Sequence, residues 1–146
     1  MTFQIGTIAI GSDHRAREIV DGLAIHLEPL GWTVRKHYGG DADSVDYPCI
    51  SNAVTSEVVS GEAVCGVLIC GSGIGMSMAA NKADGIRAAL VHEPNAAEMS
   101  RRHNDANVLC MAANSPMDSD YNAIVDTWLA TEFEGGRHQR RVELMR

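Results

Sequence analysis

A chain of 146 residues is long enough for one domain, which would bury roughly 68–70% of the surface that the unfolded chain exposes. We therefore expect a single domain over residues 1–146, with a short basic C-terminal helix from about residue 136. The net charge of −7 disfavours binding to nucleic acid or to an anionic membrane, and no apolar run approaches the ~18 residues that a membrane span requires.

The first third of the chain predicts two strands and two helices. Thr7 to Gly11 is an apolar run that predicts a strand, and apolar residues then recur at helical spacing over 19–30. Gly31 suits the end of that helix, and Thr33 to Lys36 predicts a second strand. After a polar loop, Pro48 is well placed to begin the second helix. The apolar positions of the first helix are Ile19, Leu23, Leu27 and Leu30.

The same alternation continues through the middle of the chain. Val64 to Cys70 predicts the central strand, which is followed by a glycine-rich turn and a helix. Ile86 to Val91 and Asn107 to Met111 predict the fourth and fifth strands, with a helix between them. Apolar residues between Tyr121 and Leu129 form the stripe of a further long helix, which Gly135-Gly136 is expected to break.

Strands that alternate with helices predict a parallel sheet with right-handed crossovers and helices on both faces. The loops that follow parallel strands share one edge of the sheet. We therefore expect Asp13-His14, Cys70 with its glycines, Glu93-Pro94 and the segment after Met111 to converge at that edge.

Cys70 ends the central apolar strand and is followed by three alternating glycines, Gly71, Gly73 and Gly75. Such a turn lets backbone N–H groups approach an anion at the start of the next helix. The positive end of the helix dipole would stabilise a thiolate there, which makes Cys70 the leading candidate for a base or a nucleophile. The alternative interpretation is that Cys70 only completes a buried strand.

Two common phosphate-binding motifs do not match this turn. A P-loop requires Lys and then Ser or Thr after its last glycine, whereas Gly75 is followed by Met76 and Ser77. The dinucleotide fingerprint has the spacing G-x-G-x-x-G after the first strand, whereas this turn has G-x-G-x-G in the middle of the chain. The remaining interpretation is a cradle for a small anion such as a phosphate, a carboxylate or an enediolate.

Other polar residues are further candidates, each with a purely structural alternative. Asp13 and His14 could bind hydroxyls or a phosphate, or they could form a helix N-cap with an exposed histidine. His103 lies in a polar cluster at a helix end, where it could take part in catalysis or complement the helix dipole. Arg137 and Arg141 lie on one helical face and could bind one phosphate, or they could belong to a solvated tail.

Tyr47 could hydrogen-bond a substrate or fix its loop to Pro48. The four cysteines form no C-x-x-C pair, and the N-terminus has no long apolar stretch. Together these features predict a reduced, cytoplasmic protein without structural zinc.

Seven motifs, in order and over nearly the whole chain, resemble the ribose-5-phosphate isomerase B and galactose-6-phosphate isomerase (LacA/LacB) family of aldose–ketose sugar-phosphate isomerases. They are Gly11-Ser12-Asp13-His14, Asp46-Tyr47-Pro48, Ile69-Cys70-Gly71-Ser72-Gly73-Ile74-Gly75, Ala80-Asn81-Lys82, Gly85-Ile86-Arg87-Ala88, 102–109 (Arg-His-Asn-Asp-Ala-Asn-Val-Leu) and Glu134-Gly135-Gly136-Arg137-His138. Several motifs in the right order are far more specific than any one of them.

The resemblance implies a three-layer Rossmann-like α/β fold with a five-stranded parallel sheet, and catalysis without a metal or other cofactor. It also implies a homodimer, or a dimer of dimers, with active sites shared between subunits. By the family pattern, Cys70 is the base that moves a proton between C1 and C2, and His103 is the acid that opens the sugar ring. The implied substrate-binding residues are Asp13, His14, Tyr47, Gly71, Ser72, Gly73, Ile74, Gly75, Asn104, Arg137 and Arg141.

The reaction expected first is the conversion of ribose 5-phosphate to ribulose 5-phosphate through a cis-enediolate. This chemistry needs a base that shuttles a proton and donors for the oxygen that becomes negative, and a thiolate beside backbone N–H groups supplies both. The alternatives are isomerisation of a hexose 6-phosphate, of a tetrose phosphate or of an unphosphorylated sugar. From other classes, a non-catalytic sugar-phosphate-binding module and a hydrolase with Cys70 as nucleophile and His103 as base stay open.

One position departs from the family pattern. Many family members carry an arginine shortly after Asn-Val-Leu as a further phosphate ligand, whereas this chain has Asn114. An amide donates a hydrogen bond but brings no charge. The affinity for ribose 5-phosphate is accordingly expected to be modest.

Overall fold

The structure is a computed structural model that describes residues 2–39, 45–114 and 120–145. Within these residues five strands form one sheet in the order β2-β1-β3-β5-β4, and every neighbouring pair is parallel. The strands are β1 (Thr7–Ser12), β2 (Thr33–Tyr38), β3 (Cys65–Cys70), β4 (Ala88–Leu90) and β5 (Val108–Ala112). The predicted five-stranded parallel sheet is confirmed.

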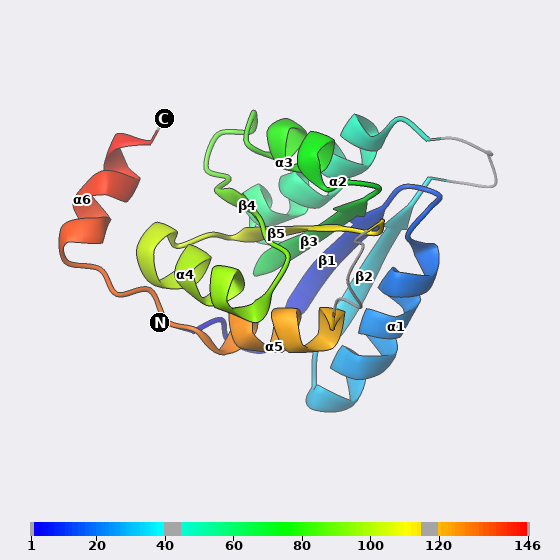
Figure 1. Cartoon of the computed structure of the whole chain (residues 1–146), viewed down its shortest axis with the longest axis horizontal. Helices are drawn as coiled ribbons and strands as arrows, with labels where there is room; N and C mark the ends of the chain where they lie inside the picture. Colours follow the sequence, from blue (N-terminus) through cyan, green and yellow to red (C-terminus); the bar gives the residue numbers. More distant parts are fainter. Residues whose placement is uncertain (1, 40–44, 115–119, 146) are drawn as a thin grey trace.

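Helices cover both faces of this sheet, which gives the three layers of a Rossmann-like fold (Figure 1). Helices α2 (Tyr47–Ser60) and α3 (Ile74–Ala80) lie on one face, and α1 (Arg17–Leu27), α4 (Pro94–Asn104) and α5 (Tyr121–Ala130) lie on the other. Right-handed crossovers that run in opposite directions along a sheet place their helices on opposite faces, which explains the division. No helix in the described ranges is long and apolar enough to cross a lipid bilayer.

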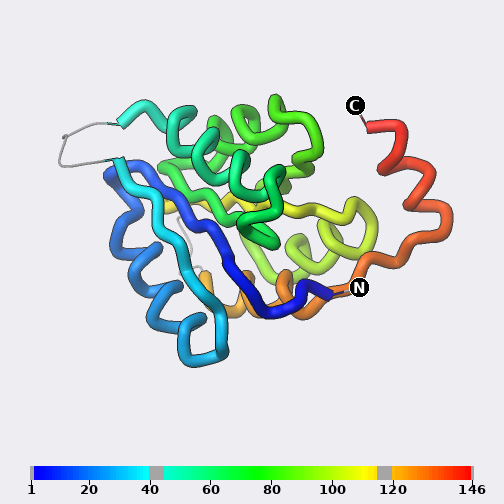
Figure 2. The backbone as a smooth tube through the Cα atoms, turned by 180° about the vertical axis from the view of Figure 1, so that it is seen from behind, coloured from blue at the N-terminus to red at the C-terminus, as the bar shows by residue number. Residues whose placement is uncertain are grey.

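Helix α6 (Arg137–Leu144) stands apart from both layers, beyond the end of the sheet (Figure 2). It packs on α4 rather than on a strand. The helix begins directly after Gly135 and Gly136, which both have positive φ, as expected for a helix that starts near residue 136.

The central strand β3 is buried on both faces, because its side chains alternate between two apolar clusters. Val67 and Ile69 belong to the cluster under α1, α4 and α5, whose largest fully buried side chain is Trp128. Leu68 and Cys70 point to the opposite cluster under α2 and α3. Core packing therefore fixes the position of Cys70 at the end of the strand.

Two predicted elements are shorter than expected. Helix α1 stops at Leu27 and continues as a short 3-10 turn over Glu28–Leu30, because Pro29 has no N–H to extend the helical ladder. Leu30 is therefore 52% exposed and does not belong to the buried stripe of that helix. The fourth strand is shorter than predicted, because the N–H of Ile86 closes a turn onto the carbonyl of Ala83.

Helix α5 carries the predicted apolar stripe, with Ile124, Val125, Trp128 and Leu129 all buried. It nevertheless ends at Ala130, before Gly135-Gly136 is reached. The backbone of Thr131 is extended, and its hydroxyl donates to the carbonyl of Thr127 at 2.6 Å. The glycines therefore shape the start of α6 rather than the end of α5.

Candidate functional site

Three loops meet at the carboxyl edge of the sheet, beyond β1, β3 and β5. From β1 the chain crosses to β2 on one side, while β3 lies on the other side, so the strand order reverses between β1 and β3. Ligands bind outside the strand ends at such a switch point in open α/β sheets. Hydrogen bonds continue past the strands, from the N–H of Asp13 to the carbonyl of Ile69 (3.3 Å) and from the N–H of Asn114 to the carbonyl of Gly71 (2.9 Å). The predicted convergence is confirmed for the loops after β1, β3 and β5, whereas these hydrogen bonds do not involve the Glu93-Pro94 segment.

The turn after Cys70 needs its glycines because other groups lie very close to it. Gly73 has φ of 75°, and a Cβ there would lie 2.5 Å from Leu90 Cδ1 and 2.9 Å from the carbonyl oxygen of Met111. A Cβ on Gly75 would lie 2.6 Å from the ring of Tyr47. The turn is therefore tightly packed between the end of β5 on one side and the first residue of α2 on the other.

Cys70 differs from the other buried cysteines in its surroundings. Its Sγ accepts a hydrogen bond from the backbone N–H of Gly73 at 3.2 Å, and an N–H donor stabilises negative charge on sulfur. Burial raises the pKa of the Cys65 and Cys110 thiols, which are fully enclosed in the core. Cys49 is exposed on α2. Only Cys70 combines a place at the switch point with an N–H donor to its sulfur, among the four cysteines of the chain.

Asp13 lies at the same edge and is almost fully buried, at 9% exposure. Its Oδ1 accepts the backbone N–H of Arg15 at 3.0 Å. Helix α1 starts only at Arg17, and its N-cap residue, Ala16, has no capping side chain. The N-cap interpretation of Asp13 is therefore wrong, while His14 is exposed beside it.

Tyr47 covers the glycine turn from the α2 side. Its ring lies against Gly75, so its contact is with the turn, and 40% of the residue remains exposed. Ser72 supports the turn through its Oγ, which accepts the N–H of Ile74 at 3.2 Å. Ile74 itself is 49% exposed. The predicted residues from Gly71 to Gly75 thus form one compact wall beside Cys70.

His103 and Asn104 lie elsewhere, at the C-terminal end of α4. Asp105 ends this helix with a positive φ of 48°, and its carboxylate accepts hydrogen bonds from Arg101 (2.7 Å) and Arg87 (3.1 Å). Arg101 is buried and also donates to the carbonyl of Ala106 at 2.8 Å. This network holds the helix end in place, and the polar motif at 102–107 is therefore partly structural.

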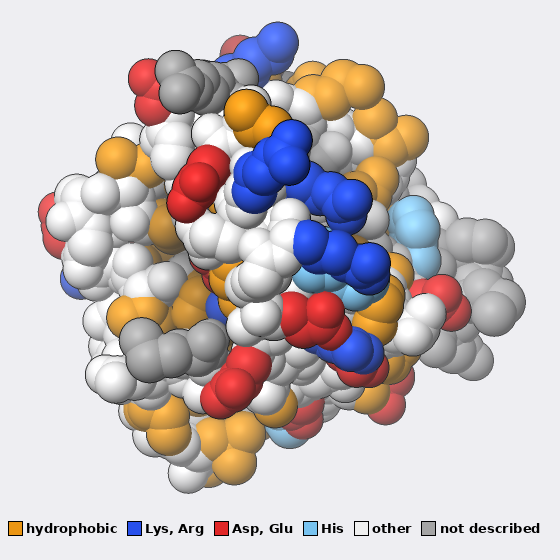
Figure 3. All heavy atoms as spheres, turned by 90° about the vertical axis from the view of Figure 1, so that its left-hand side faces the viewer, with side chains coloured by type: hydrophobic (Ala, Val, Ile, Leu, Met, Phe, Trp, Pro, Cys, Tyr) orange, Lys and Arg blue, Asp and Glu red, His pale blue; other side chains and the backbone are white. Residues whose placement is uncertain are grey.

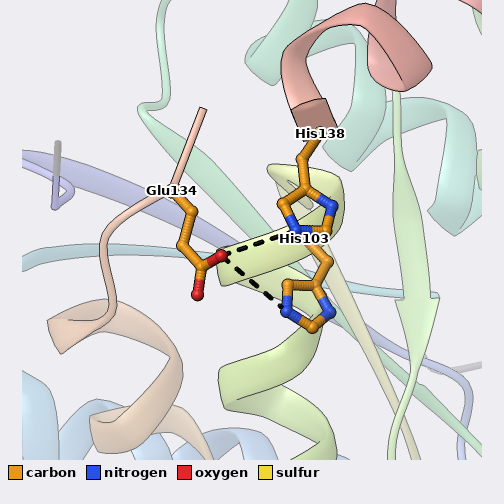
Figure 4. Close-up of side chains that lie close together, drawn as sticks. All are labelled: His103, Glu134 and His138. Atoms are coloured by element: carbon orange, nitrogen blue, oxygen red, sulfur yellow. Dashed lines mark ion pairs between the residues drawn. The ribbon is translucent and has the colours of Figure 1, made fainter. Parts of the chain in front are cut away.

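His103 is stacked on His138 of α6, with ring centroids 4.3 Å apart and planes 13° from parallel (Figure 4). Glu134 faces both rings, with its Oε2 3.4 Å from Nε2 of His138 and 4.0 Å from Nε2 of His103. Hydrogen bonding from Arg102 lowers the pKa of Glu134, and desolvation lowers the pKa of His138. The arrangement holds the His103 ring between an imidazole face and a carboxylate.

These three side chains also have the composition of a metal-binding group, with candidate ligand atoms within 4.8 Å of one another. An imidazole binds a metal in the plane of its ring, about 2.0–2.1 Å from nitrogen in zinc sites. The two rings are nearly parallel and stacked, so an ion in the plane of one would lie outside the plane of the other. The present geometry therefore suits orientation of His103 better than chelation.

Basic side chains gather on the surface formed by α6, beside histidine (Figure 3). Arg137, Arg140 and Arg141 are all exposed. In the part of the chain that the structure describes, Arg137 and Arg141 form no ion pair, unlike Arg102, which bonds to Glu134. The guanidinium groups of Arg137 and Arg141 are thus available to an anionic ligand.

Within one chain, the Cys70 region and the His103 region lie at opposite edges of the sheet. Asn107, four residues after His103, accepts the N–H of Gly66 near the amino end of β3 at 3.0 Å. Cys70 is the fourth residue after Gly66 along β3. At the ~3.3 Å rise per residue of a parallel strand, the two residues are about 13 Å apart. The resemblance implies active sites shared between subunits, and within a single chain Cys70 and His103 do not lie together.

Three residues at these sites were not predicted to be functional: Arg15, Glu134 and His138. Glu134 and His138 lie in a motif that carried the resemblance, without an assigned role. Arg15 directly follows Asp13-His14 in a loop already expected at the site. The positive charge of Arg15 in this loop is the feature of the sequence that could have indicated a role in binding an anion.

Comparison with known proteins finds relatives that match nearly the whole chain. The profile of a family described as Ribose/Galactose Isomerase matches residues 8–145. The chain is 42% identical over 136 residues to ribose-5-phosphate isomerase B of Escherichia coli K12, which covers 93% of this chain and 91% of that protein. It is 39% identical over 138 residues to ribose-5-P isomerase B of Listeria innocua, and the match covers 94% of this chain and 93% of that protein.

Solved structures give the same result. The chain is similar to ribose-5-phosphate isomerase B of Clostridium thermocellum, with a TM-score of 0.88 and 44% identity over 94% of this chain and 93% of that one. It is also similar to a ribose 5-phosphate isomerase of Thermotoga maritima, with a TM-score of 0.90 and 42% identity over 95% and 96% of the two chains.

Proposed function

The chain belongs to the ribose/galactose isomerase family, and we propose that it interconverts ribose 5-phosphate and ribulose 5-phosphate, with Cys70 as base and His103 as ring-opening acid. At the coarser level it is a sugar-phosphate isomerase. The observation that carries the finer assignment is the Cys70 sulfur, which lies at the switch point of the sheet and accepts the N–H of Gly73 at 3.2 Å.

The reaction begins when His103 opens the furanose, by giving a proton to the ring oxygen as the bond from C1 to that oxygen breaks. The anomeric hydroxyl loses its proton to water as O1 becomes the aldehyde oxygen, and His103 regains a proton from solvent. The Cys70 thiolate then takes the proton from C2 of the open aldose. The electron pair forms the C1–C2 double bond, and negative charge moves onto O1. Backbone N–H groups of the turn from Gly71 to Gly75 stabilise this charge. A proton passes from O2 to O1, and the thiol returns its proton to C1, which yields the ketose and regenerates the thiolate.

The active site is shared between two copies of the chain in this proposal. Cys70 and His103 lie at opposite edges of the sheet in one chain, so a second copy must supply the His103 region to each Cys70. Around the glycine turn, Ile74 and Met78 of α3 are 49% and 64% exposed, which is the kind of apolar surface that a partner covers. A groove of about 710 Å³ lies close to the His103 region. It is lined by residues 84–87, which precede β4, and by Asn104 and Met145.

The substrate assignment is tested with purified protein and a panel of aldoses and ketoses. Ribose 5-phosphate, a hexose 6-phosphate, a tetrose phosphate and the corresponding free sugars are compared by kcat/KM. We expect ribose 5-phosphate to give the highest value. A higher value for any other member of the panel would contradict the assignment.

The assignment of Cys70 is tested with Cys70→Ala beside Cys49→Ala, because Cys49 is an exposed cysteine with no assigned role. Loss of a general base costs about 10²–10⁴-fold in rate, so Cys70→Ala should lower kcat by that factor. Substrate binding, measured by calorimetry, should remain. Cys49→Ala should be close to wild type. If Cys70→Ala kept more than about a tenth of the wild-type kcat, Cys70 would not be the base.

A further inference from the structure

Two side chains from different loops meet at Gly71, on the outer side of the glycine turn. A Cβ on Gly71 would lie 3.0 Å from Nη1 of Arg15 and 3.2 Å from Nδ2 of Asn114. Arg15 comes from the loop after β1, and Asn114 comes from the loop after β5. Both therefore present N–H donors at the same point of the switch-point crevice.

The backbone around both residues is held by hydrogen bonds. The N–H of Arg15 donates to the Asp13 carboxylate at 3.0 Å, and the N–H of Ala16 donates to the carbonyl of Asp13 at 3.3 Å. The N–H of Asn114 donates to the carbonyl of Gly71 at 2.9 Å. The fold therefore positions the backbone of both residues before any ligand arrives.

The Arg15 guanidinium has no anionic partner among the residues that the structure describes. Arg35, Arg87, Arg101 and Arg102 form ion pairs with Glu57, Glu62, Glu98, Asp105 and Glu134, and none of these carboxylates is paired with Arg15. The Asp13 carboxylate is nearby, but its recorded hydrogen bond is to the backbone of Arg15 and not to the guanidinium. An exposed cation beside an amide donor is suited to an anionic group of a ligand.

We propose that Arg15 and Asn114 together bind the phosphate of the substrate, and that Arg15 supplies the charge which Asn114 lacks. The proposal rests on the proposed function, because it places the phosphate of the same sugar phosphate on which Cys70 acts. The sulfur of Cys70 points into the cluster under α2 and α3, whereas Arg15 leads into α1 on the opposite face. In ribose 5-phosphate the phosphate is carried on C5, three carbons beyond C2, so the phosphate and the reacting carbons need separate places in the crevice.

The inference changes the expectation for Asn114. From the sequence, an amide where the family pattern has an arginine indicated a modest affinity for ribose 5-phosphate. With the Arg15 guanidinium against the same glycine, the positive charge is retained and is only carried by another loop. An arginine at both positions would place two cations side by side, which is unfavourable.

Steady-state kinetics with ribose 5-phosphate and with D-ribose test the proposal. Arg15→Ala should raise KM for ribose 5-phosphate by about tenfold or more, the loss expected for one charge-assisted interaction, with a smaller change in kcat. The kinetics with D-ribose, which has no phosphate, should not change. Arg140→Ala removes another exposed arginine, which has no assigned role, and should match wild type. An unchanged KM in Arg15→Ala would overturn the proposal.

Moving the charge back to position 114 gives a second test. Asn114→Arg in the Arg15→Ala background should restore KM to within about threefold of wild type, because one guanidinium again faces the phosphate. The single substitution Asn114→Arg in an otherwise unchanged chain should give no gain in KM. If Asn114→Arg lowered KM equally in both backgrounds, the two positions would act independently. That result would contradict the claim that Arg15 supplies the charge which Asn114 lacks.

A binding measurement separates this proposal from the proposed function. Calorimetry with inorganic phosphate needs no turnover, and Arg15→Ala should weaken binding about tenfold relative to wild type. If wild type does not isomerise ribose 5-phosphate but loses phosphate binding on Arg15→Ala, the proposed function fails and the anion site stands. Equal phosphate binding by both proteins, or none by either, would overturn the anion site.

Discussion

The Cys70 region and the His103 region are built in opposite ways. Around Cys70, main-chain groups and glycines determine the geometry, and a Cβ at Gly73 would come within 2.9 Å of a backbone carbonyl. Around His103, the geometry comes from side chains, namely a stacked imidazole and a carboxylate at the surface. Substitution of the tightly packed glycines in the first region should therefore lower the stability of the fold, whereas substitution of His103 in the second should lower activity alone.

Removal of the His103 imidazole should produce a large kinetic effect with little effect on stability. His103→Ala is expected to reduce kcat with ribose 5-phosphate by about 10²–10⁴-fold, because ring opening loses its acid. The loss should be much smaller with an aldose phosphate too short to close a ring. The melting temperature should change little, since His103 is partly exposed and rests on the surface of α6. Equal losses on both substrates would indicate a structural role instead.

Substitution of a glycine in the turn after Cys70 should lower the free energy of unfolding. Gly73→Ala places a Cβ against Leu90 and the carbonyl of Met111 at a φ of 75°, and strain of both kinds should lower the free energy of unfolding by about 2–4 kcal/mol. Gly135→Ala is the matched control, because its φ is 65° and a Cβ there meets nothing within 4 Å. It should lose only about 1 kcal/mol. Chemical denaturation measures both, and equal losses would contradict the packing argument.

The arginines of α6 should give the smallest effect. Arg137→Ala or Arg141→Ala removes one exposed guanidinium and should raise KM for ribose 5-phosphate by about tenfold. The free energy of unfolding should be unchanged, since neither residue forms an ion pair among the described residues. Kinetics at two salt concentrations would sharpen the result, because a lost charge also reduces the salt dependence of KM. If both variants kept the wild-type KM, the basic surface of α6 would be no more than a solvated face.

The same contrast explains which features could be predicted from the sequence. Apolar periodicity identified the strands, and the rule that loops after parallel strands share an edge brought Asp13, Cys70 and the segment after Met111 together. Local patterns did not reveal that Pro29 ends α1 early or that α5 stops at Ala130, because those boundaries depend on single hydrogen bonds.

Contacts between distant segments were the harder part to predict. Nothing in the spacing of residues indicated that His103 stacks on His138 or that Arg15 and Asn114 meet at Gly71, since each pair joins segments far apart in the sequence. The family motifs suggested which residues matter, and the roles of those residues stay predictions. They did not indicate that Cys70 and His103 lie at opposite edges of the sheet within one chain.

The most direct test of the account is complementation between two inactive variants. Cys70→Ala and His103→Ala are prepared separately, and each should be nearly inactive with ribose 5-phosphate. After subunit exchange, half of the dimers contain one of each variant, and each such dimer has one site with both Cys70 and His103 intact. The mixture should therefore recover about a quarter of the wild-type specific activity. A mixture whose dimers have exchanged but whose activity stays at the level of the separate variants would contradict a site shared between two chains.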